Sequence, residues 1–333
     1  MQTSVIEFIK QGTRRRAGAV ALAFVAMAAP GLAAAAYPDQ MIRLVVPWPP
    51  GGATDSVGRI IAQHLGERLK QSVIVDNKGG AGGNIGTATF VRDRPDGYTL
   101  LMATSSTNAA NPSLYSRLGF DAQKDFAPIA FVVTIPNILE VPRNSPFQSV
   151  QALLDYARAN PGKLNFGSGG VGSSQHLAGS MLTHATGMNI AHIPYKGSGP
   201  AVSDLLAGHL DMMIDTGSLA QVQAGNLRAL AVASEKRLPT LPDVPTFDEL
   251  GIKGMHASAW YGIVAPRGTP KEIVDRLNKE INAILAEPDV RKTLVGLGGQ
   301  LSEPETPEQF GAFMQSEITR YKTIVEQSGA KLD

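Results

Sequence analysis

The sequence contains no cysteine, so disulfide bonds and thiolate metal ligands are both excluded. Its six histidines show no H-E-x-x-H spacing and no compact pair. Because cysteine and histidine are the usual ligands of transition metals in proteins, the sequence predicts no metal site. Stability must therefore come from packing of the hydrophobic residues, which make up 43% of the chain.

A strong net charge and nucleotide-binding motifs are lacking as well. The net charge is +1 for the whole chain and −2 for residues 37–333, and the one basic run lies at 14–16. Nucleic acids require clustered lysine and arginine to neutralise phosphates. No G-x-x-x-x-G-K-[ST] motif occurs, and Ile85 stands where Gly80 and Gly82 would need a third glycine for G-x-G-x-x-G. We therefore predict no nucleic-acid partner, no nucleotide and no cofactor.

The first 36 residues have the order of a secretory signal peptide. A basic stretch, Arg14 to Arg16, precedes an uncharged run over 17–32 and then a series of alanines that ends at Ala36. The uncharged run is about 16 residues long, shorter than the roughly 20 that span a bilayer. We predict cleavage near Ala36 and a protein that works in the periplasm.

Short apolar runs alternate with helical patterns over most of the chain, which is typical of an α/β fold with largely parallel sheets. The predicted strands are 42–46, 73–75, 99–102, 164–166, 212–214 and 229–232. Apolar residues at helical spacing predict helices around 57–69, 153–157, 271–286, 289–297 and 307–328.

Two extended segments have the composition of crossings between two lobes. One is 131–141, which is interrupted by Pro136, and the other is 260–264, which precedes a turn rich in proline and glycine. Two crossings make the first lobe discontinuous. We predict lobe 1 at 37–136 plus 263–333, lobe 2 at 137–262, and C-terminal helices that pack on lobe 1.

Four times, an apolar strand is followed by a glycine-rich loop that leads directly into a helix. These loops are 47–55, 77–86, 167–174 and 194–200. The first turn of a helix leaves backbone N–H groups without intrahelical partners and carries partial positive charge. Glycine allows close approach of the backbone, and serine, threonine and asparagine add directed hydrogen bonds. One glycine-rich loop alone is equally consistent with a tight turn, but four loops predict an anion site.

The residues expected to bind the ligand come mainly from these loops and from the strand ends beside them. They are Trp48, Pro50, Gly51, Gly52, Thr54, Asp55, Gly82, Gly83, Asn84, Ser105, Gly169, Ser173, Ser174, His176, Tyr195, Lys196, Gly197 and Asp215.

No set of residues has the pattern of a catalytic site. His176 follows Ser173 and Ser174, but no G-x-S-x-G motif surrounds either serine. Asp211 and Asp215 flank a short strand, which makes Asp215 a cleft residue and Asp211 an ordinary surface residue. We therefore predict a binding protein and no catalytic residue.

A series of motifs in order along nearly the whole mature chain resembles the Bug-type periplasmic receptors of tripartite tricarboxylate transporters. The motifs lie at 37–38, 47–55 (PxxxGGxxD), 77–86, 96–98, 125–129, 160–165, 192–199, 238–245 and 260–270. Two places depart from the family pattern. Gly79 and Gly80 stand where a proline is often found, and Thr216 and Gly217 follow Asp215 in a variable stretch.

The resemblance implies a two-lobed, type II periplasmic-binding-protein (Venus flytrap) fold that closes around its ligand. It implies a small organic carboxylate as ligand, held by first-lobe loops and by the helix start near Gly167 to His176, and membrane transporter subunits as partners. The sequence leaves open whether the acid is a mono- or a dicarboxylate and whether it is aromatic. Two alternatives also remain open: a ligand-binding sensor of a signalling system, and a periplasmic hydrolase or lyase.

Overall fold

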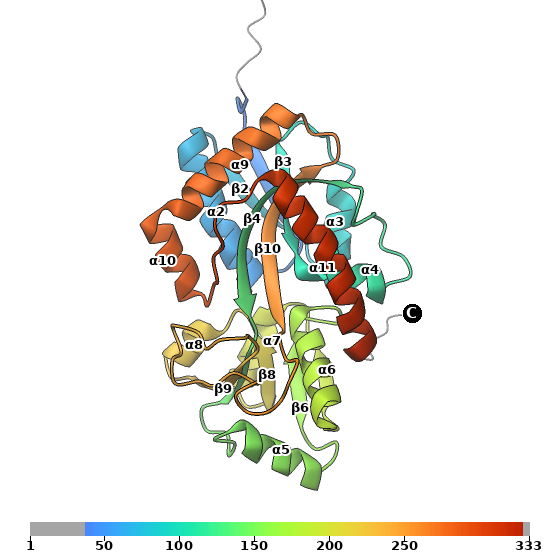
Figure 1. Ribbon diagram of the computed structural model, residues 1–333, viewed down its shortest axis with the longest axis vertical. Helices are drawn as coiled ribbons and strands as arrows, with labels where there is room; N and C mark the ends of the chain where they lie inside the picture. The colour runs from blue at the N-terminus through green and yellow to red at the C-terminus, as the bar shows by residue number, and fades with distance from the viewer. Residues whose placement is uncertain (1–36, 329–333) are drawn as a thin grey trace, which may run out of the picture. The chain divides into compact units, whose positions relative to one another are not determined.

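The computed structural model describes residues 37–328 (Figure 1). The predicted signal peptide lies outside the described residues. Within them, no helix combines the length and the apolar character needed to cross a membrane.

The first sheet has five strands in the order β2-β1-β3-β10-β4. β1 pairs in parallel with β2 and β3, whereas β10 is antiparallel to β3 and β4. The strands are β1 (Ile42–Val46), β2 (Val73–Asn77), β3 (Thr99–Thr104), β4 (Phe126–Pro136) and β10 (Ser258–Pro266). The helices and short helical turns that accompany them are α2 (Ala53–Leu69), η1 (Ala81–Gly83), α3 (Asn84–Phe90), η2 (Ser106–Ala110), α4 (Asn111–Leu114), α9 (Lys271–Ala286), α10 (Pro288–Gly296) and α11 (Pro307–Ser328).

The second sheet also has five strands, in the order β7-β6-β8-β5-β9. β6 is parallel to β7 and β8, and β5 is antiparallel to β8 and β9. The strands are β5 (Ile138–Pro142), β6 (Asn165–Ser168), β7 (Ala191–Pro194), β8 (Met212–Asp215) and β9 (Leu227–Val232). The helices are α5 (Val150–Ala159), α6 (Ser174–Thr186), α7 (Ser198–Leu206) and α8 (Leu219–Gln223).

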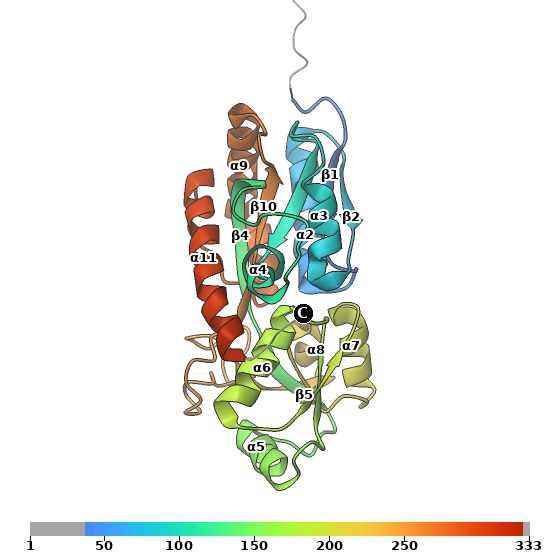
Figure 2. The same cartoon turned by 90° about the vertical axis from the view of Figure 1, so that its right-hand side faces the viewer.

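The two sheets have separate hydrophobic cores, and we call each sheet with its helices a lobe. Lobe 1 buries Phe90, Leu101 and Phe310 in one cluster, and lobe 2 buries Phe166 and Ile214 in another. The C-terminal helix α11 lies beside β4 (Figures 1 and 2), because its apolar stripe packs on the lobe 1 cluster. The stripe consists of Phe310, Met314, Tyr321 and Val325.

The chain passes from lobe 1 to lobe 2 at Asn137 and returns ahead of Ser258. β4 belongs to the first sheet and β5 to the second, with Asn137 alone between them. The boundary predicted between 262 and 263 falls inside β10, which lies in the first sheet over its full length. The sequence signal there, an aromatic and β-branched run before Pro266, marks a buried strand of lobe 1 and not the crossing itself.

The predicted two-lobed α/β class is confirmed, but the sheets are mixed and not largely parallel. Each sheet contains parallel pairs made by strand, helix, strand units, together with antiparallel pairs made by the strands next to the crossings. β10 enters the first sheet from lobe 2, and β5 enters the second from lobe 1, so both run against the strands beside them.

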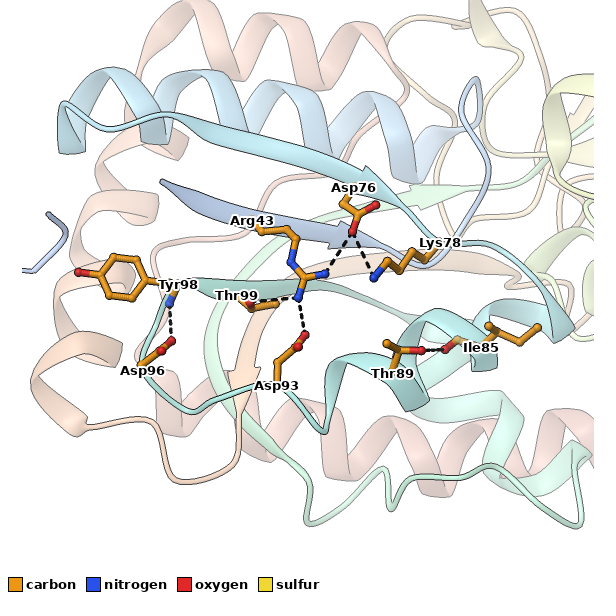
Figure 3. A network of polar contacts seen from close by, with 9 residues as sticks. All are labelled: Arg43, Asp76, Lys78, Ile85, Thr89, Asp93, Asp96, Tyr98 and Thr99. Carbon is orange, nitrogen blue, oxygen red and sulfur yellow. Dashed lines mark hydrogen bonds and ion pairs between the residues drawn. The ribbon is translucent and has the colours of Figure 1, made fainter. Parts of the chain in front are cut away.

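Arg43 joins the three strands at one side of the first sheet (Figure 3). Its guanidinium lies 3.2 Å from an Asp76 carboxylate oxygen on β2 and 2.7 Å from Asp93, and it donates to the hydroxyl of Thr99 on β3 at 3.3 Å. Lys78 adds a second cation, 3.4 Å from Asp76. Because the Arg43 side chain is 30% exposed, solvent screens these ion pairs only in part.

Replacing Arg43 with glutamine removes the charge that bridges β2 and β3. We expect Arg43→Gln to lower the free energy of unfolding by about 1 kcal/mol, the upper range for part-exposed ion pairs, in urea titrations at low salt. Arg94→Gln, at an exposed position near by, serves as the control. Equal losses in the two variants would contradict a stabilising role for the Arg43 network.

Candidate functional site

A cleft between the lobes, which we call the front cleft, brings together residues from both sheets. Its volume is about 430 Å³, including the part that is open to solvent. The residues that line it are Trp48, Pro49, Gly52, Ala53, Thr54, Thr104, Ser105, Ser106, Gly169, Ser174, Gln175, Gly197, Ser198, Thr216, Ala259 and Tyr261.

Three helices begin at the front cleft. α2 begins at Ala53 after Gly52, α7 begins at Ser198 after Gly197, and neither has a side-chain cap in the part of the chain that the structure describes. α6 begins at Ser174, and Ser173 caps its first turn by accepting from the His176 N–H at 3.3 Å. Uncapped first-turn N–H groups and helix dipoles that meet at one cleft favour a negatively charged ligand.

A fourth wall comes from the end of β3, where the chain turns into the π-helical segment η2. Thr104, Ser105 and Ser106 line the cleft here without any glycine. The turn is stabilised internally, because the backbone N–H of Thr104 donates to Asn108 Oδ1 at 3.3 Å and the Thr107 hydroxyl donates to the same oxygen at 2.7 Å. The hydroxyl-rich strand end therefore has a fixed conformation.

The two lobes touch across the front cleft. A methyl group added at Gly197 would come within 3.0 Å of Pro49, and one at Gly217 would come within 3.1 Å of the Ala53 backbone nitrogen. Gly197 also has φ +109°, a conformation that favours glycine. At the outer edge, the Tyr115 hydroxyl of lobe 1 donates to the Val171 carbonyl of lobe 2 at 3.4 Å. The lobes are therefore in a closed arrangement.

The front cleft has polar walls without a basic side chain. Among residues 37–328, no lysine, arginine or histidine lines it, whereas eight hydroxyl groups do. An anion bound there would be stabilised by backbone N–H groups and hydroxyls. The hydroxyls belong to Thr54, Thr104, Ser105, Ser106, Ser174, Ser198, Thr216 and Tyr261, of which Ser198 already donates to Asp215.

Asp215 lies directly behind the cleft wall and fixes three groups there. Its carboxylate accepts from Gln175 Nε2 at 2.7 Å, from the Ser198 hydroxyl at 2.8 Å and from the Gly217 N–H at 2.9 Å. The residue is fully buried. Asp215 therefore holds the starts of α6 and α7 together and is a positioning residue. The sequence predicted that it contacts the ligand directly, but it does not line the front cleft.

Asp55 has a similar positioning role in lobe 1. It accepts from the Gly51 N–H at 3.1 Å and from Asn77 Nδ2 at 3.0 Å, and it forms an ion pair with Arg59. Burial raises the pKa of Asp55, but these hydrogen bonds together with the Arg59 charge leave it below its usual value. The charged carboxylate holds the loop before α2 in shape and does not line the front cleft.

The other predicted residues divide between an outer cleft and the interior. Trp48, Gly169 and Gly197 line both clefts. The outer cleft, of about 1360 Å³ with its open part, also contains Pro50, Gly82, Tyr195 and Lys196. Gly83 packs beside Thr107, and Asn84 is buried and accepts from Asn111 Nδ2 at 2.7 Å. The loop at 77–86 therefore contributes to the outer cleft and not to the front cleft.

Sequence reasoning missed several residues of the front cleft. They are Pro49, Ala53, Thr104, Ser106, Gln175, Ser198 and Thr216, with Ala259 and Tyr261 from β10. Ser198 and Gln175 occupy the first helical turns of α7 and α6, so their position after the glycine loops was a usable signal. Thr104 and Ser106 carry no such signal, because a π-helical turn has no clear sequence pattern.

His176 and His192 form a pair of tilted, closely packed rings behind the start of α6. Their ring centroids are 4.3 Å apart, and His192 Nε2 lies 2.7 Å from the Ser168 hydroxyl. Burial, with the nearby His176 as a second cause, lowers the pKa of His192 to about 4, and burial also lowers the pKa of His176. Both rings are therefore neutral at pH 7, and His176 supports the α6 start from behind.

The lowered pKa of His192 predicts a dependence of stability on pH. The unfolded chain binds protons at His192 below about pH 6.5, whereas the folded chain resists protonation down to about pH 4. The free energy of unfolding is therefore highest above pH 6.5 as far as His192 is concerned, and it decreases as the pH falls from 6.5 towards 4. We expect His192→Gln to remove roughly 2 kcal/mol of the fall in unfolding free energy between pH 7 and 4.5.

Urea unfolding at several pH values measures this effect, and the exposed His184→Gln variant is the matched control. If the parent, His192→Gln and His184→Gln proteins lose stability in parallel, the buried pair does not set this pH dependence.

A model of the tripartite tricarboxylate transporter family receptors matches residues 57–330 of this chain. Two curated relatives match over nearly the same length. Protein BugT of Bordetella pertussis is 38% identical over 314 residues, covering 93% of this chain and 96% of BugT. A Pseudomonas sp. (strain P51) protein, named for its place in the tcbD-tcbE intergenic region, is 40% identical over 317 residues and 94% of each chain.

Solved structures of similar proteins have the same fold. The periplasmic binding protein BugD has a TM-score of 0.84 at 38% identity, covering 89% of this chain and 99% of BugD. Rpa4515 of Rhodopseudomonas palustris, solved with adipate, has a TM-score of 0.84 at 36% identity, with 88% and 98% covered. MatC of the same organism, with bound malate, has a TM-score of 0.82 at 32% identity, with 87% and 100% covered.

One further structure differs in overall superposition. A solute-binding protein of this type from Polaromonas, solved with no ligand, has a TM-score of 0.62 at 33% identity, with 87% and 99% covered. Its sequence is as similar to this chain as that of the malate-bound protein.

Proposed function

Because the chain belongs to the tripartite tricarboxylate transporter receptor family, we propose that its front cleft captures a small dicarboxylate and delivers it to a membrane transporter. The family consists of periplasmic binding receptors and not of enzymes, so the prediction of a non-enzymatic protein is confirmed. The observation that carries the proposal is the meeting of uncapped helix starts from both lobes at one hydroxyl-lined cleft.

The geometry of the cleft favours a carboxylate over a larger anion. Its volume of about 430 Å³, including the open part, lies at the low end for small-molecule sites. A first carboxylate group fits against the starts of α2 and α7. There, backbone N–H groups and the hydroxyl of Tyr261 can donate charge-assisted hydrogen bonds to it. The outer cleft continues from this site through Trp48 and Gly169, which gives space for a second carboxylate.

The ligands of two similar proteins support a dicarboxylate in particular. Adipate and malate are the acids named in the solved structures of Rpa4515 and MatC. Adipate places its carboxyl groups farther apart than malate, and a site that anchors one end at helix starts accommodates both lengths. We therefore propose aliphatic dicarboxylates of four to six carbons as the ligand class of this chain.

Closure of the lobes on the ligand is part of the proposal. This chain superposes better on the malate-bound protein than on the Polaromonas protein without ligand, although the two identities are 32% and 33%. Sequence divergence does not account for that difference, and a different angle between the lobes would produce it. We infer that the closed arrangement is the ligand-bound form and that the empty receptor opens.

Isothermal titration calorimetry on residues 37–333 tests the ligand class. We expect malate or adipate to bind, and adipamide, which has the length of adipate without its charges, to give no heat of binding. Failure of every four- to six-carbon dicarboxylate to bind would contradict the proposal, and so would equal binding of adipamide.

A substitution in the cleft tests the location of the site. Tyr261→Phe removes a buried hydroxyl from the cleft wall, and we expect the acid to bind about tenfold more weakly because one charge-assisted hydrogen bond is lost. Tyr156→Phe makes the same change at a residue that is 42% exposed on α5. Unchanged affinity in Tyr261→Phe would place the ligand elsewhere.

A further inference from the structure

A second cavity, which we call the back cavity, lies beside the crossings and shares no residue with the front cleft. Its volume is about 950 Å³, including the part that is open to solvent. Lobe 1 and lobe 2 both contribute to its walls. The lining residues are Thr134, Ser234, Glu235, Lys236, His256, Ser258, Trp260, Gln300, Phe313, Glu317 and Arg320.

Strand β10 separates the two spaces. Successive side chains of a strand point to opposite faces of the sheet. Ala259 and Tyr261 line the front cleft, and Ser258 and Trp260 line the back cavity. β10 therefore forms a wall of both spaces, and each of these residues of the front cleft is adjacent in sequence to a residue of the back cavity.

Trp260 presents a buried hydrogen-bond donor without a partner. Its side chain is 1% exposed and is held by edge-to-face contacts with Phe310 and Phe313, whose ring centroids lie 6.1 and 5.5 Å away. Among the described residues, no acceptor bonds its indole Nε1–H. Buried polar groups in folded proteins almost always have a partner, and the cavity that Trp260 lines is where an acceptor would fit.

Within the described part of the chain, the wall of the back cavity offers an anionic acceptor one cation that is not already paired. Glu317 is already paired with Arg320, with two oxygen–nitrogen distances of 2.6 and 2.7 Å, and His256 lies 2.8 Å from Asp248. Glu235 and Lys236 are both exposed at the edge of the cavity, and neither forms an ion pair within residues 37–328. Lys236 is thus the lysine or arginine of the cavity wall that has no carboxylate partner.

We propose that the back cavity is a second binding site, for a small oxyanion such as a carboxylate or a phosphate. One oxygen of the anion accepts from Trp260 Nε1–H, and Lys236 balances its charge. Thr134 and Ser258 lie next to the chain crossings in lobe 1, and Ser234 follows the crossing contact at Ala233 in lobe 2. The shape of the site therefore changes with the angle between the lobes.

The chain contains only two tryptophans, and they lie in different sites. In a Trp48→Phe variant of residues 37–333, Trp260 is the single indole. Its ¹⁵N-labelled indole N–H resonance then reports the back cavity directly during separate titrations with acetate and with inorganic phosphate. We expect a shift that saturates with at least one probe, and the probe that saturates identifies the carboxylate or the phosphate as the preferred oxyanion.

Substitution of the cation locates the site. Lys236→Gln in the Trp48→Phe background is expected to weaken the saturating shift about tenfold, because a charge-assisted contact is lost. Lys163→Gln, at an exposed lysine in lobe 2, is the matched control and is expected to leave the shift unchanged. Dicarboxylate binding at the front cleft, measured by calorimetry on chains that keep Trp48, provides the check that Lys236→Gln remains folded.

Three results would overturn the proposal: an indole signal that does not move, a shift that rises linearly without saturating, or equal shifts in Lys236→Gln and Lys163→Gln. The last result would assign the shift to an anion in the front cleft acting through β10. The first two outcomes do not bear on whether the front cleft binds a dicarboxylate, which calorimetry measures separately.

Discussion

The structure depends on the contact between the two chain crossings. Asn137 donates from its backbone N–H at 3.0 Å and from its side-chain amide at 2.9 Å to the carbonyl of Ala257, and its own carbonyl accepts from the Ala233 N–H at 2.9 Å. Asn137 is fully buried. The chain therefore crosses between the lobes at one short, hydrogen-bonded segment, and a change in the angle between the lobes must be taken up at or beside this segment.

Both proposed ligand sites follow from this connection. The front cleft lies where helix starts of lobe 1 and lobe 2 face each other, so closing the lobes brings backbone N–H groups to an anion from two sides. Asp55 and Asp215 hold the loops behind these helix starts in shape, and each does so without occupying the cleft. Strand β10, which begins directly after Ala257, then connects the front cleft to the back cavity.

Much of this arrangement was predictable because local patterns determine it. The strands, the two lobes and the helix starts after Gly52, Ser173 and Gly197 follow from hydrophobic periodicity and from the placement of glycine-rich loops. The position of the loop at 77–86 was not predictable, since which strand neighbours which is a tertiary property. The same holds for Asp215, whose role depends on Gln175 and Ser198 from two other elements. A carboxylate at a strand end, such as Asp215, has the same sequence pattern whether it faces the ligand or lies behind the cleft wall.

A crystal structure of residues 37–333 grown with malate tests the central claim most directly. The account predicts closed lobes and a malate carboxylate in the front cleft, within hydrogen-bond distance of backbone N–H groups in the first turns of α2 and α7. Malate bound outside the front cleft, or held there only by lysine or arginine side chains with no contact to either helix start, would contradict it.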